Sequence, residues 1–309
     1  MTLQENELIK IRRDLHQIPE IGLEEYETSD YLLKIINGLP QENLEIKRWK
    51  TAILVHLNGE NKNYTIGYRT DIDGLPVEEK TGLPFSSKHE GRMHACGHDI
   101  HMTVALGVLS YFASHRPKYN MTFIFQPAEE NASGGMKLYQ SGELDEWMPD
   151  EIYALHDNPQ LPAGTIGCRK GTLFAGTCEI HVKFIGKSGH AAYPHQANDM
   201  VVAGAQFVNQ IQTIVSRNVD PIQSGVVTLG HFSAGTTGNV ISGVCQIDGT
   251  IRALTQENNL LIQKRVRTIA EGIAHSFDCE LEIDLHQGGY YPVENDDNTT
   301  EAFINYMKN

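Results

Sequence analysis

The sequence predicts an α/β fold, in which a mixed, largely parallel sheet flanked by helices carries an inserted α+β domain of antiparallel sheet and two helices. Strand-like residues 121–127 follow a helix-spaced segment at 99–114, and strand-like residues 151–157 come next, which is the order of a βαβ unit. Near residue 172 the order changes to strand, helix, strands, helix and strand, which is typical of a small antiparallel sheet. A chain of 309 residues is also longer than a single hydrophobic core usually serves, so two domains are expected.

Apolar periodicity assigns the elements of the first domain. Pro19 separates the first two helices, because proline disrupts a helix interior, and the third helix stops before Pro117. The predicted elements are helices at about 5–17, 24–37 and 99–114 and strands at about 45–49, 52–58, 64–71, 121–127 and 151–157.

The second domain is predicted to be an insertion. Its elements are strands at about 177–187, 225–232, 243–254 and 279–285 and helices at about 198–217 and 257–275.

The end of the chain is predicted to return to the first domain. Thr299 or Thr300 could cap a helix that runs through residues 301–309. The sequence stops about where this helix starts, so we expect a C-terminal part of the first domain to be missing. The predicted domains are 1–172 with 288–309, and the inserted 173–287.

Charge and hydropathy exclude several classes of protein. The net charge of −14 disfavours a nucleic-acid partner, because phosphate contacts need a basic face. No apolar run approaches the roughly 18 residues that a membrane span needs. The N-terminal segment is charged and helix-patterned, unlike a secretion signal. We therefore expect a cytoplasmic protein without a membrane or nucleic-acid partner.

The five cysteines predict no disulfide framework, because their number is odd and they form no CxxC pair. Cys168, Cys178, Cys245 and Cys279 are interpreted as buried small apolar residues. Cys96 differs from them because of its neighbours.

Polar side chains gather at the carboxyl ends of three predicted strands. RTDIDGLP follows one strand, QPAEEN follows the next, and His156 and Asp157 end the third, while MHACGHDIH lies just before the crossover helix. Ligands of open α/β sheets bind beyond these strand ends. One acidic residue can occur there by chance, but three clusters at one edge predict a site.

The segment HACGHD contains two candidate metal ligands. Cys96 and His98 flank a glycine, and a turn would let both side chains reach one point. Thiolate and imidazole suit zinc, nickel, cobalt or manganese to different degrees. The alternative, a buried cysteine beside a surface histidine, is weakened by the nearby His94 and His101. These two histidines are interpreted as supporting or packing residues rather than ligands.

The acidic pair Glu129–Glu130 and the lone His156 are further candidates. In a turn, one carboxylate can ligate a metal while its neighbour takes a proton from the attacking water. The alternative is a solvated acidic loop, which is weakened because the pair directly follows an apolar strand. Of Asp71 and Asp73, one could orient a metal-bound histidine and the other could cap a turn, and the sequence leaves their order open.

In this order and at these spacings, RTDIDGLP, MHACGHDIHMT, FQPAEE, ALH and GKSGHAAYPH resemble the aminoacylase/carboxypeptidase family of dinuclear metallo-amidohydrolases. The similarity is to the branch with a cysteine in the metal centre, which includes hippurate hydrolases, indole-acetyl-amino-acid hydrolases and N-acetyldiaminopimelate deacetylases. The segments IRRDLHQIPEIGLEEYETSDYLL, HAAYPHQANDMVVA and QTIVSRNVDP are most similar to the last group.

The resemblance implies a catalytic first domain, two divalent metal ions and an N-acyl amino acid substrate. Cys96 would bridge the metals, which would be zinc, manganese, nickel or cobalt. His98, Glu130 and His156 would be terminal ligands. Glu129 would be the general base, although the roles of the two adjacent glutamates could be exchanged.

The remaining implied roles complete the site. Asp71 would be the catalytic aspartate, and His190 in the inserted lid would bond the oxyanion, in a neighbouring subunit's site if the protein is a homodimer or higher homo-oligomer. Asn239 and Arg252 would hold the substrate carboxylate.

One departure from the family is the absence of the C-terminal stretch that supplies a final histidine ligand. The first functional hypothesis is hydrolysis of an acetylated diaminopimelate in lysine biosynthesis. The alternatives are a broad N-acyl-amino-acid amidohydrolase or carboxypeptidase, and a catalytically silent binding protein.

Overall fold

The computed structural model describes residues 2–288 and 290–308, in two compact units, Met1–Ala163 and Gly164–Asn309. The predicted fold class is confirmed, with a mixed sheet and helices in the first unit and an antiparallel sheet with helices in the second. The predicted return of residues 288–309 to the first domain is not tested by this division and stays a prediction. Within the described ranges, no helix combines the length and apolar character needed to cross a membrane.

The sheet of the first unit has the strand order β1-β2-β4-β3-β5. β3 pairs in parallel with both β4 and β5, while β1–β2 and β2–β4 are antiparallel. The three mutually parallel strands therefore end at one edge, where Asp71 of β3 pairs in register with Gln126 of β4. The strands are β1 (Leu44–Trp49), β2 (Ala52–Leu57), β3 (Asn61–Asp71), β4 (Tyr119–Gln126) and β5 (Glu151–Ala154).

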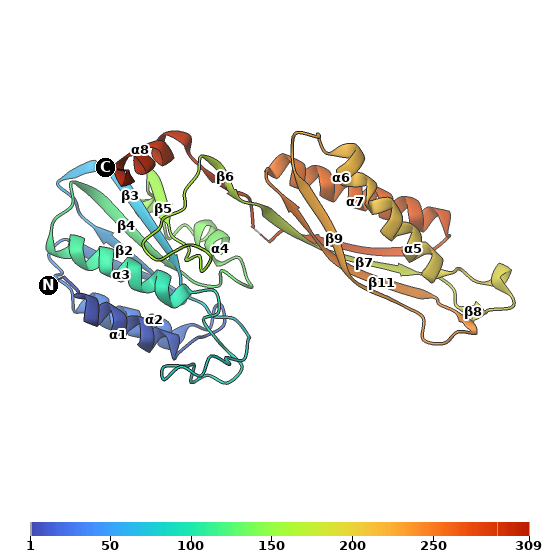
Figure 1. The fold of residues 1–309 in the computed structure, drawn as a ribbon, viewed down its shortest axis with the longest axis horizontal. Helices are drawn as coiled ribbons and strands as arrows, with labels where there is room; N and C mark the ends of the chain where they lie inside the picture. The colour runs from blue at the N-terminus through green and yellow to red at the C-terminus, as the bar shows by residue number, and fades with distance from the viewer. Residues whose placement is uncertain (1, 289, 309) are drawn as a thin grey trace. The chain divides into compact units, whose positions relative to one another are not determined.

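Helices cover both faces of this sheet (Figure 1). Alternate residues of β2 explain why: Ile53 and Val55 belong to the core cluster shared with α1, α2 and α3, whereas Ala52 and Leu54 belong to the cluster beneath α4. The short helix α4 was not predicted from the sequence. The helices are α1 (Glu5–His16), α2 (Tyr26–Asn37), α3 (His98–Ser114), α4 (Gly134–Gln140) and the 3₁₀ turn η1 (Asp145–Trp147).

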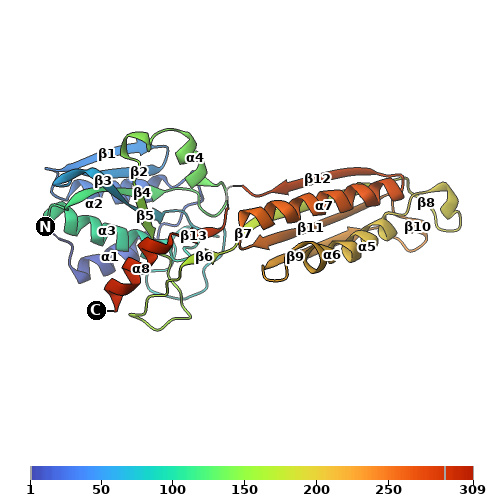
Figure 2. The same cartoon turned by 90° about the horizontal axis from the view of Figure 1, so that it is seen from above.

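The second unit is built on a four-stranded antiparallel sheet in the order β12-β7-β11-β9, with α5, α6 and α7 packed on one face (Figures 1 and 2). The sheet and its helices are β7 (Gly176–Ile185), α5 (Met200–Ile211), α6 (Thr213–Asn218), β9 (Gly225–Ala234), β11 (Val244–Ala253), α7 (Gln256–Ser276) and β12 (Glu280–His286). Smaller elements are β6 (Gly171–Phe174) paired with β13 (Val293–Asn295), β8 (Gly189–His190) paired with β10 (Val240–Ile241), η2 (Pro194–Gln196) and α8 (Asp297–Met307).

Two helix predictions need correction. The predicted helix over 198–217 is interrupted at Gln212, where the Thr213 hydroxyl donates to the Gln210 carbonyl oxygen at 2.7 Å and competes with the helix ladder. The last helix is not capped by either predicted threonine: its N-cap is Asp296, whose carboxylate accepts from a backbone N–H in the first turn. That helix therefore begins earlier than predicted, and residue 309 lies outside the described residues.

The prediction for the cysteines is correct for Cys178 and Cys245, which are buried. It is wrong for Cys168, which is exposed, and Cys279 is only half-buried. Cys168 follows β5 in a segment that forms neither helix nor strand before β6, and its side chain is exposed.

Truncating Phe207 to alanine is expected to lower the free energy of unfolding of the second unit by about 3–5 kcal/mol, because it leaves a cavity in a packed core. The ring is fully buried on α5 and meets the Phe184 ring edge-on, with centroids 5.7 Å apart. Chemical denaturation measures the loss. Ile222→Ala, at a side chain 91% exposed, is the control and is expected to change stability by about 0.5 kcal/mol or less.

Candidate metal centre

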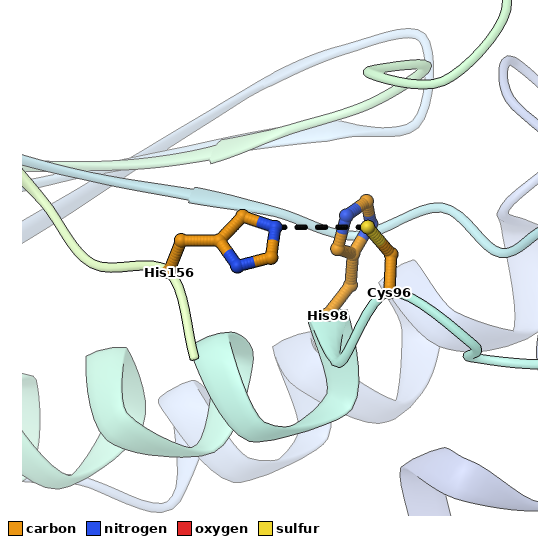
Figure 3. A group of neighbouring side chains, drawn as sticks. All are labelled: Cys96, His98 and His156. Atoms are coloured by element: carbon orange, nitrogen blue, oxygen red, sulfur yellow. Dashed lines mark hydrogen bonds between the residues drawn. The ribbon is translucent and has the colours of Figure 1, made fainter. Parts of the chain in front are cut away.

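Two segments bring a thiol and two imidazoles together at the carboxyl edge of the first unit's sheet (Figure 3). Cys96 precedes α3, His98 is its first residue, and His156 follows β5. Cys96 Sγ lies 3.6 Å from His156 Nε2. The turn requires Gly97, which has φ of 82°, and a Cβ there would lie 2.2 Å from the carboxylate of Asp157.

The two histidines are oriented in the same way. His98 Nδ1 donates to the carbonyl oxygen of Asp73 at 2.8 Å, and His156 Nδ1 donates to the carbonyl oxygen of Asp157 at 2.7 Å. A histidine held through Nδ1 presents its Nε2 lone pair to the site, which is the usual arrangement of a metal ligand.

The predicted carboxylate ligand faces this site. Glu130 Oε1 lies 3.7 Å from His98 Nε2, and among the described residues neither of these two buried atoms has a hydrogen-bond partner. The backbone N–H of Glu130 donates to Asp73 Oδ2 at 2.9 Å. Asp73 therefore holds both the ring of His98 and the backbone of Glu130. Two opposed, unpartnered buried ligand atoms are the local signature of a site that fits a cation.

Among the described residues, four overlapping groups of side chains could therefore hold metal ions, and His98 belongs to three of them. Within each group the ligand atoms lie within 4.8 Å of one another. Two groups contain the residues predicted as ligands: Cys96 with His98 and His156, and His98 with Glu129 and Glu130. The other two are Asp71 with His98 and His101, and His101 with His156 and Asp157. The four residues predicted as ligands therefore lie in two candidate groups that share His98.

The electrostatics of the cluster favour positive charge at its centre. Burial opposes it, but the nearby side chains of Asp73 and Cys96 raise the pKa of His98 to about 11. The contact with Cys96 raises the pKa of His156 to about 9. The same thiol and carboxylates would stabilise a divalent cation, which would displace the Nε2 protons.

Glu129 has a different environment from its neighbour. Burial, followed by repulsion from Glu130, raises the pKa of the Glu129 carboxyl above its ordinary value. A raised pKa suits a carboxylate that takes a proton in one step and returns it in the next. This environment suits the role of base that was expected for Glu129, while both glutamates lie in one candidate metal-binding group with His98.

The open assignment of the two aspartates resolves in favour of Asp73 as the residue that orients His98. Asp71 Oδ2 lies 3.7 Å from His98 Nε2, and the Asp71 carboxylate accepts from His101 Nδ1 at 2.7 Å and from Arg69 at 2.8 Å. Burial acts against it, but these contacts hold the pKa of Asp71 below its usual range.

Two histidines beside the ligands have distinct environments. His101 joins Asp71 to Asp157, with its Nε2 accepting from the Asp157 backbone N–H at 2.9 Å. His94 is buried, and neither ring nitrogen has a hydrogen-bond partner among the described residues. Burial lowers the pKa of His94 to about 4, so its ring is neutral.

Arg69 was missed as a site residue. It was quoted only as part of RTDIDGLP, yet its guanidinium bonds Asp71 and, at 2.8 Å, Gln126. An arginine two residues before a strand-end aspartate is on the same side of the strand, and this alternation was the available signal.

The predicted residues of the second unit lie at two different places. His190 and Asn239 are neighbours, because β8 pairs with β10 and the Ala191 N–H donates to the Asn239 carbonyl oxygen at 3.1 Å. Arg252 is at the far end of β11, eight residues beyond Val244, which corresponds to about 26 Å of strand. Within this unit, Arg252 is therefore not brought together with Asn239.

Comparisons with known proteins agree with this fold and show the family. A family model described as peptidase family M20/M25/M40 matches residues 67–309. The chain belongs to this family, which makes it a metal-dependent hydrolase.

The more particular similarity is to N-acetyldiaminopimelate deacetylases. The protein of that name from Lactiplantibacillus plantarum is 70% identical over 100% of this chain and 81% of its own length. The one from Lactobacillus acidophilus is 61% identical over 99% and 81%.

Solved structures agree as well. A protein from methicillin-resistant Staphylococcus aureus aligns with a TM-score of 0.91 at 33% identity, over 98% of this chain and 81% of that one. The Bacillus subtilis YxeP protein, described as a dinuclear metal binding peptidase from the M20 family, aligns with a TM-score of 0.79 at 33% identity, over 96% and 77%.

Proposed function

We propose that this protein hydrolyses N-acetyl-L,L-2,6-diaminopimelate to acetate and L,L-diaminopimelate, a reaction of lysine biosynthesis, with two divalent metal ions. The observation that carries the proposal is the opposed pair of unpartnered buried atoms, His98 Nε2 and Glu130 Oε1, beside Cys96 and His156. The names of the deacetylase relatives support the substrate.

The residues that we propose would hold the metal ions are Cys96, His98, Glu130 and His156. Such a mixture of sulfur, nitrogen and oxygen donors is compatible with zinc, manganese, nickel or cobalt. When bound, the ions would polarise the amide carbonyl group and lower the pKa of the attacking water.

Glu129 moves the proton in this scheme. Its carboxylate accepts a proton from water as the water oxygen forms a bond to the amide carbon. It then returns this proton to the nitrogen as the carbon–nitrogen bond breaks, which yields acetate and the free amine. The raised pKa of Glu129 supports both halves of this cycle, because a stronger base accepts more readily and the resulting acid still donates.

His190 is the proposed donor to the oxyanion. Its Nδ1 accepts from the Ala192 N–H at 3.1 Å, so the neutral ring carries its proton on Nε2, where it can donate. A donor already held in this tautomer stabilises developing negative charge without rearrangement. Asp71, held by His101 and Arg69, would keep the surroundings of His98 negative.

Asn239 and Arg252 are the proposed ligands of the substrate's carboxylates. Diaminopimelate carries two α-carboxylates, which an amide and a guanidinium can bond separately. The separation of these residues along β11 supports contributions to different carboxylates or different subunits. A homodimer or higher homo-oligomer therefore remains part of the proposal.

Two further proposals are independent of these residues. One assigns residues 1–172 and 288–309 to the catalytic domain and 173–287 to the inserted domain, and the other is a cytoplasmic location.

A substrate panel tests the choice of substrate. Turnover of acetyl-diaminopimelate is expected to exceed that of hippurate and an indole-acetyl amino acid by about tenfold or more in kcat/KM, because only the first offers a second carboxylate and a free amine. The assay uses metal-loaded protein, with chelated protein as the blank. Equal turnover of all three would identify a broad amidohydrolase, and a protein that binds no metal and turns over none would be a silent binding protein.

A further inference from the structure

We propose that Glu25 is a positioning residue, which aims the general base Glu129 by holding the backbone of Ala128. This inference rests on the proposed function, because it concerns the same reaction. Glu25 lies at the start of α2, 103 residues before Ala128, and nothing in the metal-site motifs includes it.

The contact between the two segments is direct and buried. Glu25 is fully buried, and its Oε1 accepts from the Ala128 N–H at 2.8 Å while its Oε2 accepts from the Thr51 hydroxyl at 2.6 Å. Burial raises the pKa of the Glu25 carboxyl, and these hydrogen bonds oppose that effect. A carboxyl group can be buried here because each of its oxygens accepts a hydrogen bond.

Ala128 needs such a restraint because of its backbone conformation. Its φ is 51°, in the left-handed region that residues with a Cβ rarely adopt. It directly precedes Glu129, so its dihedral angles set the direction in which the Glu129 side chain leaves the turn. If Ala128 relaxed to an ordinary conformation, the base would point elsewhere.

Other contacts show that the turn is held at several points. The Ala128 carbonyl oxygen accepts from the Gly134 N–H at 2.9 Å, and Asp73 holds the Glu130 N–H. The segment before Glu25 packs against the same turn: a Cβ on Gly22 would lie 2.6 Å from Ala128 Cα. Since Asp73 anchors Glu130 independently, loss of Glu25 is expected to misdirect Glu129 while Glu130 stays at the metals.

The test compares Glu25→Ala with Glu25→Gln in the metal-loaded protein. Glu25→Ala is expected to lower kcat about 100-fold with KM changed by about threefold or less, the effect of misplacing a catalytic group by about 1 Å. Glu25→Gln is expected to recover most of kcat, because its amide oxygen can still accept from Ala128 while its NH₂ donates to the Thr51 hydroxyl.

Thr51→Val is the matched control for general destabilisation. It removes the other donor to the Glu25 carboxylate but leaves the Ala128 contact, so kcat is expected to stay within about fivefold of the parent. If Glu25→Ala folds poorly, Glu25→Asp replaces it, because its carboxylate is one methylene too short to reach both donors.

Amide hydrogen exchange of the peptide that contains Ala128 is a second readout, and it does not depend on activity. In metal-free protein, exchange there is expected to be faster in Glu25→Ala and close to the parent in Glu25→Gln. Unchanged exchange in Glu25→Ala, or an equal loss of kcat in Thr51→Val, would overturn the proposal. A parent protein without deacetylase activity would refute the proposed function instead, and the exchange result would still decide the role of Glu25.

Discussion

Glu129→Gln is expected to lower kcat by about 10³-fold while the protein keeps its metal ions, because an amide cannot accept the proton from water. The substitution keeps the size and shape of the side chain. It removes the group whose pKa is raised by burial and by Glu130, and it leaves the atoms opposite His98 in place. The expected loss is therefore in turnover rather than in binding.

The measurements are metal content by elemental analysis and single-turnover rates with acetyl-diaminopimelate. Glu130→Gln is the matched variant, which is expected to lose metal as well as activity because its Oε1 is the unpartnered atom facing His98. The opposite pattern, with metal lost in Glu129→Gln and kept in Glu130→Gln, would exchange the two roles. Full turnover in Glu129→Gln would remove it as the base.

The location of the site could be predicted from the sequence because it depends on strand direction. Three segments with the pattern of parallel strands must end at one edge, and polar residues directly follow each of them. The register confirms this for the first two strands, with Asp71 opposite Gln126. His156 needed the same reasoning, since nothing in its own segment marks it as a ligand.

Contacts that join distant segments through the backbone could not be predicted. Glu25 and Ala128 are 103 residues apart, and the contact uses an N–H that every residue but proline possesses. The left-handed conformation of Ala128 is equally hidden, because alanine carries no signal for it. The dependence of the Glu129 direction on α2 therefore appears only in the structure.

Two features of the structure had a signal in the sequence that the predictions did not use. Residues 243–254 were predicted as one strand, which already places Arg252 at its far end, away from Asn239. Asp296 is as good an N-cap as the two threonines that were considered, and it stands earlier in the chain. The length of the strand gives the separation of Arg252 from Asn239, and the N-cap preference for aspartate gives the start of the last helix.

Cys96→Ala is expected to weaken metal binding by more than about 100-fold, because loss of a ligand exceeds the 10–100-fold effect of losing an outer hydrogen bond. Cys96 lies between His98 and His156 in one ligand group, so its removal leaves only two imidazoles there. Isothermal titration calorimetry, with zinc added to the metal-free protein, measures this change in affinity. Cys168→Ala is the control, since this exposed cysteine is in none of the candidate metal-binding groups found among the described residues.

The same variant should also change the titration of His156 in metal-free protein. The contact with Cys96 is the largest cause that raises the pKa of His156 to about 9, so without the thiol this pKa is expected to fall toward the ordinary value of about 6.5. NMR titration of the ring protons measures it. At a pH between about 6.5 and about 9, the His156 ring is therefore expected to be charged in the parent and neutral in the variant. A His156 pKa unchanged by the substitution would show that thiol and imidazole do not face a common point, and unchanged zinc affinity would exclude Cys96 as a ligand.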